Sequence, residues 1–415
     1  MSSPAILVIG TLDTKGAEIS YVRDRIEALG ATAIVLDSGI LGEPTNGCVA
    51  DISRQEVALA AGSSISAARA IGTRGEAVEI MIRGIRAVTL ELRRGGRLDG
   101  VLCLGGAEGA LLGAAAMHIL PVGIPKVLVS PSASGRRSFA PFVGTKDVLV
   151  MHSVVDILGL NPIATSVFDN AAAAVVGMAR DAGKPVENLS SKSIGVTMLG
   201  QTTPGVMRLR AVLEASGYEA VIFHANGVGG LAMEELIEAN ALAGVVDYSL
   251  SELANTVKDG LHAVGPSRLR VAGEHGLPQV VVPGCCDFFN QGAPESLPEE
   301  YRTRKTYYHN PVATLVRLVP EEMVQLGHMI AERLNASKGP VHVVAPTKGF
   351  SLSDRPGGHL WDPEADQALI DTLGKTLDTR IPLELVDANA NDPLFAELVG
   401  ERYLALVESM STTTL

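Results

Sequence analysis

The feature that most constrains the fold of this chain is a repeated order of apolar run, glycine-containing turn and amphipathic stretch. Residues 5–10 (AILVIG) form an unbroken apolar run, and Ile19, Val22 and Ile26 follow at helical spacing. The same order returns at residues 99–120, where DGVLCLGG leads into an alanine-rich stretch. Unbroken apolar strands that alternate with helices are typical of parallel sheets covered on both faces. The pattern therefore predicts an α/β fold with doubly wound, mostly parallel sheets.

The composition agrees with this fold class. Hydrophobic residues make up 47% of the 415 residues and aromatic residues 4%, so the core must consist mainly of aliphatic side chains. The formal net charge of −12 gives no sign of the basic surface that nucleic-acid binding needs. We expect small-molecule ligands and no nucleic-acid partner.

The first ten residues, MSSPAILVIG, contain no basic region and too short an apolar run for a signal peptide. No apolar stretch of the sequence approaches the ~20 residues of a membrane span. We therefore expect a cytoplasmic protein without membrane contact. The four cysteines lack CxxC spacing, and in that compartment we expect the adjacent Cys285 and Cys286 to be reduced.

A polar segment without periodicity, DAGKPVENLSSKS, divides the chain near its middle. We predict an N-terminal domain at residues 1–183, a linker at 184–192, a C-terminal domain at 193–408 and a frayed tail at 409–415. Each domain is expected to be Rossmann-like, with a ligand cleft between the two.

The two domains resemble an internal repeat. At an offset of 187 residues, Gly30 matches Gly217 and Arg23 matches Arg210. Because any two strand–helix units share an apolar periodicity, this match supports two similar domains without proving them.

In an open parallel sheet, ligands bind at the carboxyl ends of the strands, where loops lead into helices. Three such loops are rich in glycine or serine: residues 11–16 (TLDTKG), 105–109 (GGAEG) and 130–137 (SPSASGRR). Free backbone amides at such turns can bind phosphate. GGAEG lacks the GxGxxG spacing and no GxxxxGK[ST] occurs, and each loop alone could be an ordinary turn or N-cap. Together the three loops predict an anion site.

Polar residues also follow the predicted strands of the second half, among them His224, Asp287 and His309. A histidine beside a carboxylate can move protons near neutral pH, so we predict these three as catalytic residues. The same groups with Asp247 could ligate a metal, but no HxxxH or HExxH spacing supports this, and we predict no metal site. His309 could also be a structural loop histidine. The absence of a GxSxG elbow argues against a serine hydrolase.

Several motifs together resemble one protein family. GTLDTKGAE, LGGAEGA, SPSASG, FHANGVGGLAMEE and PTKGFSLSDRPGGHLWDPEAD stand in that family's order between Ala5 and Leu406. It is the bacterial and fungal family that also supplies the ATP-binding domain of a plant tobamovirus-resistance protein. The resemblance implies two Rossmann-like subdomains, ATP binding chiefly in the first, and a homodimer. The expected cofactor is ATP, with or without Mg²⁺.

The resemblance also implies which residues contact ATP. Where members of the family often carry a β-branched residue in the serine loop, this chain has Pro131 and Ser132, so the shape of that loop need not follow the family. The implied residues are Gly105, Gly106, Gly109, Ser130, Ala133, Ser134, Gly135, Asp156, Gly159 and Asn161, with Asp13, Thr14, Lys15 and Arg74 as companions.

Three functions remain open from the sequence. The first is an enzyme that binds ATP in the first domain and acts on a second small molecule in the interdomain cleft. The second is a regulatory or interaction protein that binds ATP without turnover. The third is a metabolic enzyme for a small acid or a phosphorylated metabolite that does not use ATP.

Overall fold

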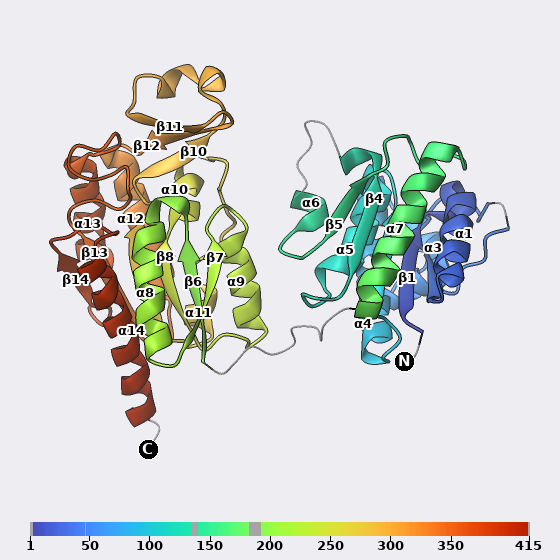
Figure 1. The fold of residues 1–415 in the computed structure, drawn as a ribbon, viewed down its shortest axis with the longest axis horizontal. Coiled ribbons are helices and arrows are strands. Elements are labelled where there is room, and N and C mark those ends of the chain that lie inside the picture. The colour runs from blue at the N-terminus through green and yellow to red at the C-terminus, as the bar shows by residue number, and fades with distance from the viewer. Residues whose placement is uncertain (1–2, 46, 134–139, 182–191, 414–415) are drawn as a thin grey trace. The chain divides into compact units, whose positions relative to one another are not determined.

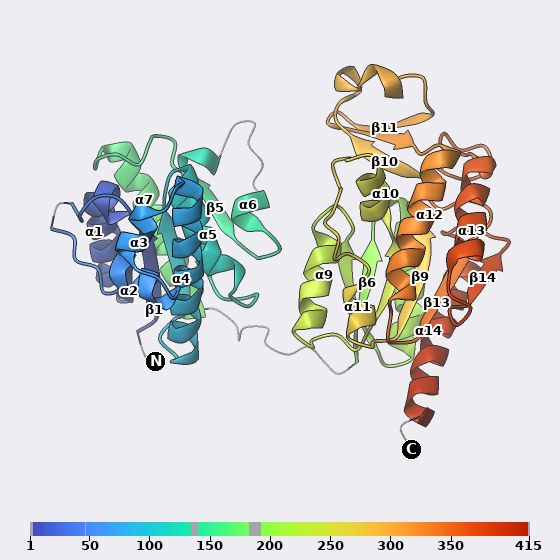
Figure 2. The same ribbon diagram turned by 180° about the vertical axis from the view of Figure 1, so that it is seen from behind.

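The chain divides after Glu187 into two units, and each is built on its own parallel sheet (Figures 1 and 2). The computed structural model describes residues 3–45, 47–133, 140–181 and 192–413. We call Met1–Glu187 the first unit and Asn188–Leu415 the second unit. The expected linker, apart from Lys192, lies outside the described residues.

The first unit contains a five-stranded parallel sheet in the order β2-β1-β3-β4-β5. The prediction of a doubly wound α/β fold is confirmed here, and β1 and β3 lie in the two apolar runs named from the sequence. The strands are β1 (Ala5–Gly10), β2 (Thr32–Asp37), β3 (Gly100–Leu104), β4 (Lys126–Ser130) and β5 (Leu149–His152).

Helices cover both faces of this sheet. Side chains from α1 and α7 form one hydrophobic cluster with the sheet, and side chains from α2, α4 and α5 form the other. The helices are α1 (Leu12–Ala28), α2 (Arg54–Ala60), α3 (Ile65–Ala70), α4 (Arg74–Arg94), α5 (Ala107–His118), α6 (Ala140–Val143) and α7 (Pro162–Asp181), with a 3₁₀ turn η1 (Pro131–Ala133).

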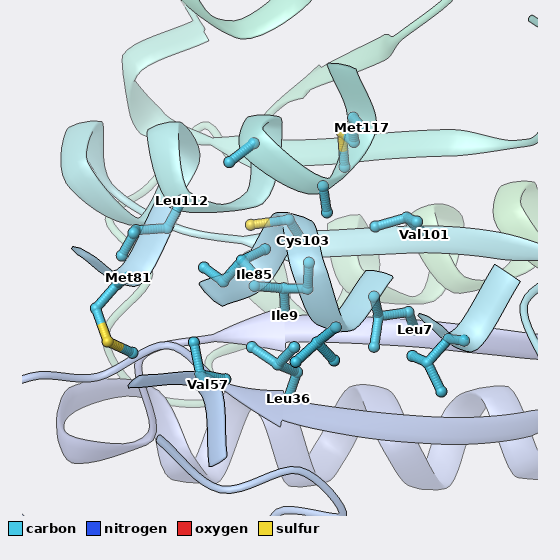
Figure 3. Packing of buried hydrophobic residues seen from close by; sticks show 14 of the residues in the cluster. Leu7, Ile9, Leu36, Val57, Met81, Ile85, Val101, Cys103, Leu112 and Met117 are labelled. Carbon is cyan, nitrogen blue, oxygen red and sulfur yellow. The ribbon is translucent and has the colours of Figure 1, made fainter. Parts of the chain in front are cut away.

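Burial on both faces explains why the strand sequences are apolar without alternation. On β1, Ile6 and Val8 belong to the cluster with α1 and α7, whereas Leu7 and Ile9 belong to the opposite cluster. Figure 3 shows Leu7 and Ile9 in that second cluster, together with Met81 of α4.

The turn expected at residues 11–16 is largely helical. α1 begins at Leu12, two residues after β1 ends, and Lys15 interrupts it with non-helical dihedral angles (φ −125°, ψ 22°). The chain can turn this sharply because the Leu12 N–H donates to the buried carboxylate of Asp37, 3.1 Å away.

The second unit contains a six-stranded parallel sheet in the order β14-β13-β9-β8-β6-β7. Residues 290–311, which have no regular pattern in the sequence, contribute to a separate antiparallel sheet in the order β10-β12-β11. The strands are β6 (Ser193–Met198), β7 (Glu219–His224), β8 (Gly244–Ser249), β9 (Gln279–Gly284), β10 (Phe288–Gln291), β11 (Thr306–Asn310), β12 (Ala313–Arg317), β13 (Val341–Pro346) and β14 (Leu383–Val386).

The last helix corrects part of the expected tail, because α14 remains helical up to Thr413 and the Ser409 hydroxyl donates to the Leu406 carbonyl oxygen (2.7 Å). Residues 414–415 lie outside the described residues. The helices of the second unit are α8 (Thr203–Ala215), α9 (Gly229–Glu238), α10 (Ser251–Val257), α11 (Val271–Glu274), α12 (Pro320–Asn335), α13 (Pro363–Thr376) and α14 (Pro393–Thr413), with 3₁₀ turns η2 (Gly200–Thr202), η3 (Pro294–Ser296) and η4 (Glu299–Tyr301).

The topology supports the internal repeat. If β1, β2, β3, β4 and β5 are matched with β6, β7, β8, β9 and β13, both sheets have the same strand order, and β14 is an addition at one edge of the second. The matched Gly30 and Gly217 both follow the end of a helix with positive φ (76° and 80°), a conformation that favours glycine.

α7 corrects one expectation about apolar segments. It has 20 residues and is long and apolar enough to cross a membrane by length and composition, although no such stretch was expected. A third of its most apolar window is buried within the structure, including Phe168 and Val175 against the sheet. Because core helices pass the same test, this is weak support for a membrane span.

Two helical glycines of the first unit lead to opposite predictions. A Cβ at Gly84 of α4 would lie 1.9 Å from the Val57 carbonyl oxygen of α2, whereas a Cβ at Gly177 of α7 would meet no atom within 4 Å. We expect Gly84→Ala to lower the free energy of unfolding of the first unit by about 2 kcal/mol, because α2 and α4 must separate. Gly177→Ala should raise it by about 0.5–1 kcal/mol. Urea denaturation followed by circular dichroism measures both, and equal effects would contradict the close approach of α2 to α4.

Candidate functional site

A pocket of about 550 Å³ lies in the first unit at the carboxyl ends of β1 and β3. These strands are neighbours, but the chain continues from β1 to β2 on one side and from β3 to β4 on the other. Loops that diverge at such a reversal leave a crevice, the usual ligand position in open α/β sheets. The lining residues are Thr11, Asp13, Thr14, Lys15, Ile40, Leu41, Gly42, Ala68, Arg69, Ile71, Gly72, Thr73, Arg74, Ala77, Gly106, Ala107, Glu108 and Gly109.

A buried ion pair holds the loops around this pocket. Asp37, at the end of β2, accepts hydrogen bonds from the N–H groups of Leu12 (3.1 Å) and Gly39 (2.9 Å). Its second carboxylate oxygen lies 2.6 Å from Nε of Arg54, and both side chains are almost fully buried. Arg54 also donates to the carbonyl oxygen of Gly42 in the pocket wall. The pair therefore ties the loops after β1 and β2 to α2.

The first turn of α5 lines the pocket, and no described residue caps its backbone amides with a side chain. Gly106 is the N-cap and offers no side chain to cap the helix, and Gly106 to Gly109 line the pocket. The first N–H groups of a helix carry partial positive charge and have no partner within it. At Gly105 an added Cβ would lie 2.4 Å from the Gly109 carbonyl carbon, whereas at Gly106 it would meet no atom within 4 Å. Glycine at 105 thus allows the close turn, and glycine at 106 leaves the amides accessible.

Among the described residues, three cationic side chains line the pocket, and each has a partner within the protein. Lys15 Nζ donates to a backbone carbonyl of the loop after β5, and Arg69 Nε donates to the Ile40 carbonyl oxygen (2.5 Å). The Arg74 guanidinium pairs with both oxygens of Glu108 (2.6 and 3.1 Å). Hydrogen bonding to Glu108 raises the pKa of Arg74 above its usual range, so Arg74 is charged.

The pocket brings together part of the predicted ATP-contact set. Gly105 lies directly beneath it, through its contact with Gly109. The carboxylate of Asp13 accepts from the N–H groups of Leu41 and Gly42 (both 3.2 Å), so it also shapes the wall. The predicted residues in the lining are Asp13, Thr14, Lys15, Arg74, Gly106 and Gly109.

Other predicted contact residues lie elsewhere. Asn161 Oδ1 accepts from the N–H groups of Ile163 (3.1 Å) and Ala164 (3.0 Å), which makes it the cap of α7. Ser134 and Gly135 lie outside the described residues, and their part in a site stays a prediction. The predicted residues that are described but do not line the pocket are Gly105, Ser130, Ala133, Asp156, Gly159 and Asn161.

The loop after β5 nevertheless touches the wall of the pocket. Lys15 Nζ donates to the Ile157 carbonyl oxygen, and the Gly159 N–H donates to the Glu18 carboxylate (2.5 Å). Residues 156–159 are thereby fixed against α1, and Asp156 precedes the residue whose carbonyl oxygen binds Lys15 of the pocket wall.

Some lining residues were not among the predicted contact residues. Thr11 and Glu108 lie within two of the glycine-containing loops, whereas Ile40, Leu41, Arg69, Ile71 and Thr73 lie between β2 and α4, outside those loops. One sequence signal marks the end of that segment, because Thr73 and Glu76 form a capping box at the start of α4, visible in sequence as T-x-x-E.

The predicted catalytic residues stand on separate segments of the second unit. His224 is exposed at the end of β7, and His309 is exposed on β11 with its ring 6.4 Å from that of Tyr307. Asp287 is fully buried between β9 and β10. Within the described part of the chain, no hydrogen bond or ion pair joins any two of these three. Their catalytic role stays a prediction.

Asp287 belongs to a buried cluster of three carboxyl groups around Arg317. Asp366 pairs with Arg317 (2.5 Å), and Asp287 accepts from the Ser351 hydroxyl (2.9 Å). One oxygen each of Asp287, Asp354 and Asp366 is buried without a hydrogen-bond donor. Burial raises the pKa of all three carboxyl groups. Because one guanidinium cannot neutralise three carboxylates, the cluster favours protonated carboxyl groups.

Asp247 lies in a second buried network. It pairs with the fully buried Arg268, which also contacts Glu252 (2.6 Å) and Glu234 (3.8 Å). These contacts link β8 to α9 and α10, so Asp247 is a structural residue here. Across the residues that the structure describes, no group of three or more potential ligands has an arrangement suited to a metal ion.

All four cysteines are buried free thiols in the structure. Burial raises the pKa of Cys103 to about 12 and that of Cys285 and Cys286 well above the usual range. Since the thiolate is the reactive form, none of these three is suited to nucleophilic chemistry.

The protein is a two-unit, doubly wound α/β protein. Its two sheets share a strand order, and a pocket lies at the strand reversal of the sheet in the first unit. The chain belongs to the Uncharacterised protein family (UPF0261): the N-terminal domain of that family matches residues 4–184 and the C-terminal domain residues 191–407. The family resemblance inferred from the motifs is confirmed.

Full-length relatives agree with this assignment. A UPF0261 protein of Clostridium tetani is 40% identical over 97% of this chain and 99% of its own length, and one of Rhizobium meliloti is 37% identical over 96% and 98%. The tomato ToMV susceptible protein tm-1(GCR26) is 33% identical over 98% of this chain and 56% of its own length. A solved Listeria monocytogenes structure is 11% identical to this chain, with a TM-score of 0.25. The match covers 67% of this chain and 79% of that chain.

The carboxyl cluster predicts a pH-dependent stability. A carboxyl group whose pKa is raised by folding keeps a proton that the unfolded chain releases above about pH 4, so stability falls as pH rises. In Asp366→Asn the amide oxygen can still accept from Arg317, and the NH₂ can donate to Asp354. We expect this variant to gain at least about 1 kcal/mol over the wild type between pH 5 and pH 9.

Urea denaturation of the second unit at both pH values measures this difference. Asp371→Asn, an exposed substitution on the same helix, is the control and should show no such trend. A difference in the free energy of unfolding between Asp366→Asn and the wild type that does not change with pH would contradict a protonated cluster.

Proposed function

We propose that the first unit binds ATP in the pocket at the carboxyl ends of β1 and β3. The observation that carries the proposal is the uncapped N-terminus of α5, which opens into a pocket with three cationic side chains. Free helix amides with nearby cations suit phosphate groups. The volume of about 550 Å³ is in the range of small-molecule sites.

The lining offers two chemically different parts. The hydroxyls of Thr11 and Thr14 and the first turn of α5 are suited to phosphate oxygens. Ile40, Leu41 and Ile71 supply apolar surface for a base. A Mg²⁺ ion carried by the phosphates would offset the carboxylates of the pocket.

The environment of Asp37 favours ATP over a dinucleotide. In dinucleotide-binding sheets an acidic residue near the end of the second strand binds the ribose hydroxyl. Asp37 occupies that position, but its carboxylate is buried and engaged by Arg54 and two backbone N–H groups. It is therefore not free to bind a ribose.

Binding, rather than turnover, is the function that the geometry supports best. Proton transfer by His224, Asp287 and His309 would require these residues to meet, and they stand on separate segments. An enzyme that acts on a second small molecule is the alternative, and ATP consumption in the presence of a substrate would favour it.

We expect Gly106→Val to weaken ATP binding at least tenfold. The side chain has room in the free protein, so the fold should be kept, but it would cover the amides of α5. Isothermal titration calorimetry with ATP and Mg²⁺ should show saturable binding by the wild type and at least tenfold weaker binding by the variant. Gly265→Val, at an exposed glycine of the second unit with equal room, is the matched control.

The outcomes separate the remaining functions. Wild-type protein that does not bind ATP at millimolar concentration contradicts the proposal, and the same titration with small phosphorylated or carboxylated metabolites then tests the third function. Binding that survives Gly106→Val contradicts the placement of ATP at α5.

A further inference from the structure

The segment Ile65–Ala77 forms one wall of the pocket with little packing of its own. It contains α3, the extended residues 71–73 and the start of α4, and it contributes Ala68, Arg69, Ile71, Gly72, Thr73, Arg74 and Ala77 to the lining. Within α3, Ala68 is the buried residue, and residues 69–76 are all exposed. Contacts other than hydrophobic burial must therefore hold this wall in place.

Two arginines fasten the segment at opposite sides of the pocket. Arg69 Nε donates to the Ile40 carbonyl oxygen (2.5 Å), and its terminal nitrogen lies 3.5 Å from the Glu43 carboxylate. Arg74 pairs with Glu108 on α5 (2.6 and 3.1 Å). One arginine thus holds the loop after β2, and the other holds the α5 N-terminus.

The partners of both arginines are oxygen atoms that a ligand could replace. The side chains of Arg69 and Glu43 are 33% and 78% exposed, and those of Arg74 and Glu108 are 68% and 32% exposed, so neither ion pair is fully buried. Exposed ion pairs contribute little to stability, whereas a guanidinium binds a phosphate through two parallel charge-assisted hydrogen bonds. Replacing the carboxylate partners of Arg69 and Arg74 with phosphate oxygens therefore costs little free energy.

We propose that Arg69 and Arg74 form a clamp that selects ligands by the number of their phosphate groups. The inference rests on the proposed nucleotide site and adds its specificity. A monophosphate can reach the α5 amides and at most one arginine, whereas a di- or triphosphate supplies separate anionic groups for both arginines and the helix N-terminus. The clamp closes when Arg74 leaves Glu108 and Arg69 leaves the loop after β2.

In this proposal Glu108 competes with the phosphate groups of the ligand for Arg74. Its carboxylate occupies Arg74 and places a negative charge in the first turn of α5. Replacing it with glutamine removes that charge and frees the guanidinium. The clamp therefore predicts opposite effects for the two members of one ion pair.

Calorimetric titration with ATP, ADP and AMP tests the clamp in the full-length protein. We expect Arg69→Gln and Arg74→Gln each to weaken ATP binding at least tenfold. Each should weaken AMP binding by less than about threefold. Glu108→Gln should strengthen ATP binding about threefold to tenfold, through the loss of one nearby like charge. Arg83→Gln, an exposed substitution on α4 outside the pocket, is the control and should change neither affinity.

Hydrogen exchange provides a second readout. Amides of residues 65–77 should gain protection when ATP is added and gain less when AMP is added, if the clamp closes on the outer phosphates. Equal losses of ATP and AMP affinity in both arginine variants, or Glu108→Gln weakening ATP binding, would overturn the clamp while wild-type binding at α5 still stands. Absence of any nucleotide binding by the wild type would instead overturn the proposed function itself.

Discussion

The reversal of strand order between β1 and β3 is the constraint on which the site depends. Parallel strands must be joined by crossover connections, and here those connections leave the two central strands in opposite directions. The loops after β1 and β3 consequently diverge, and backbone amides and side chains from both face one space. Asp37 and Arg54 then hold the surrounding loops by a buried ion pair, which costs desolvation and is stable because each charge has several partners.

The two units use the same sheet order with different results at the carboxyl edge. In the described part of the first unit this edge contains the pocket, where Gly106 carries no side chain and no side-chain cap is found for α5. In the second unit the segment after β13 folds back over the corresponding edge: the Ser353 N–H and hydroxyl both donate to Gln201 (3.0 Å each). The Phe350 carbonyl oxygen accepts from the Cys285 N–H (2.9 Å). The shared strand order thus carries a pocket at this edge in the first unit and a hydrogen-bonded segment at the corresponding edge in the second.

Charge is handled differently in the two units as well. The pocket cations of the first unit are exposed or half-buried and are held by exchangeable oxygens, which suits binding. In the second unit, Arg268 and Arg317 are buried and surrounded by more carboxyl groups than they can neutralise. In these clusters, protonation of carboxyl groups reduces the excess negative charge, because burial is the chief cause that raises the pKa of Asp287, of Asp366 and of Glu234. Such clusters fasten the fold of the second unit, and the predicted catalytic role of Asp287 stays a prediction.

The sequence by itself determined the fold class, the family and the glycine turn at Gly105–Gly109, because each depends on local order: apolar runs, helical spacing and contiguous motifs. The tertiary structure decided which residues share a site. Arg69, Ile40 and Glu108 come from three segments that are adjacent only after the strands pair in the order β2-β1-β3, and no local pattern encodes that order. For the same reason Asn161 is a helix cap and Asp287 a buried partner of Ser351, although both carry the polar groups that a binding or catalytic residue needs. Residue type limits the chemistry that a position can perform, and packing decides whether a ligand can reach it.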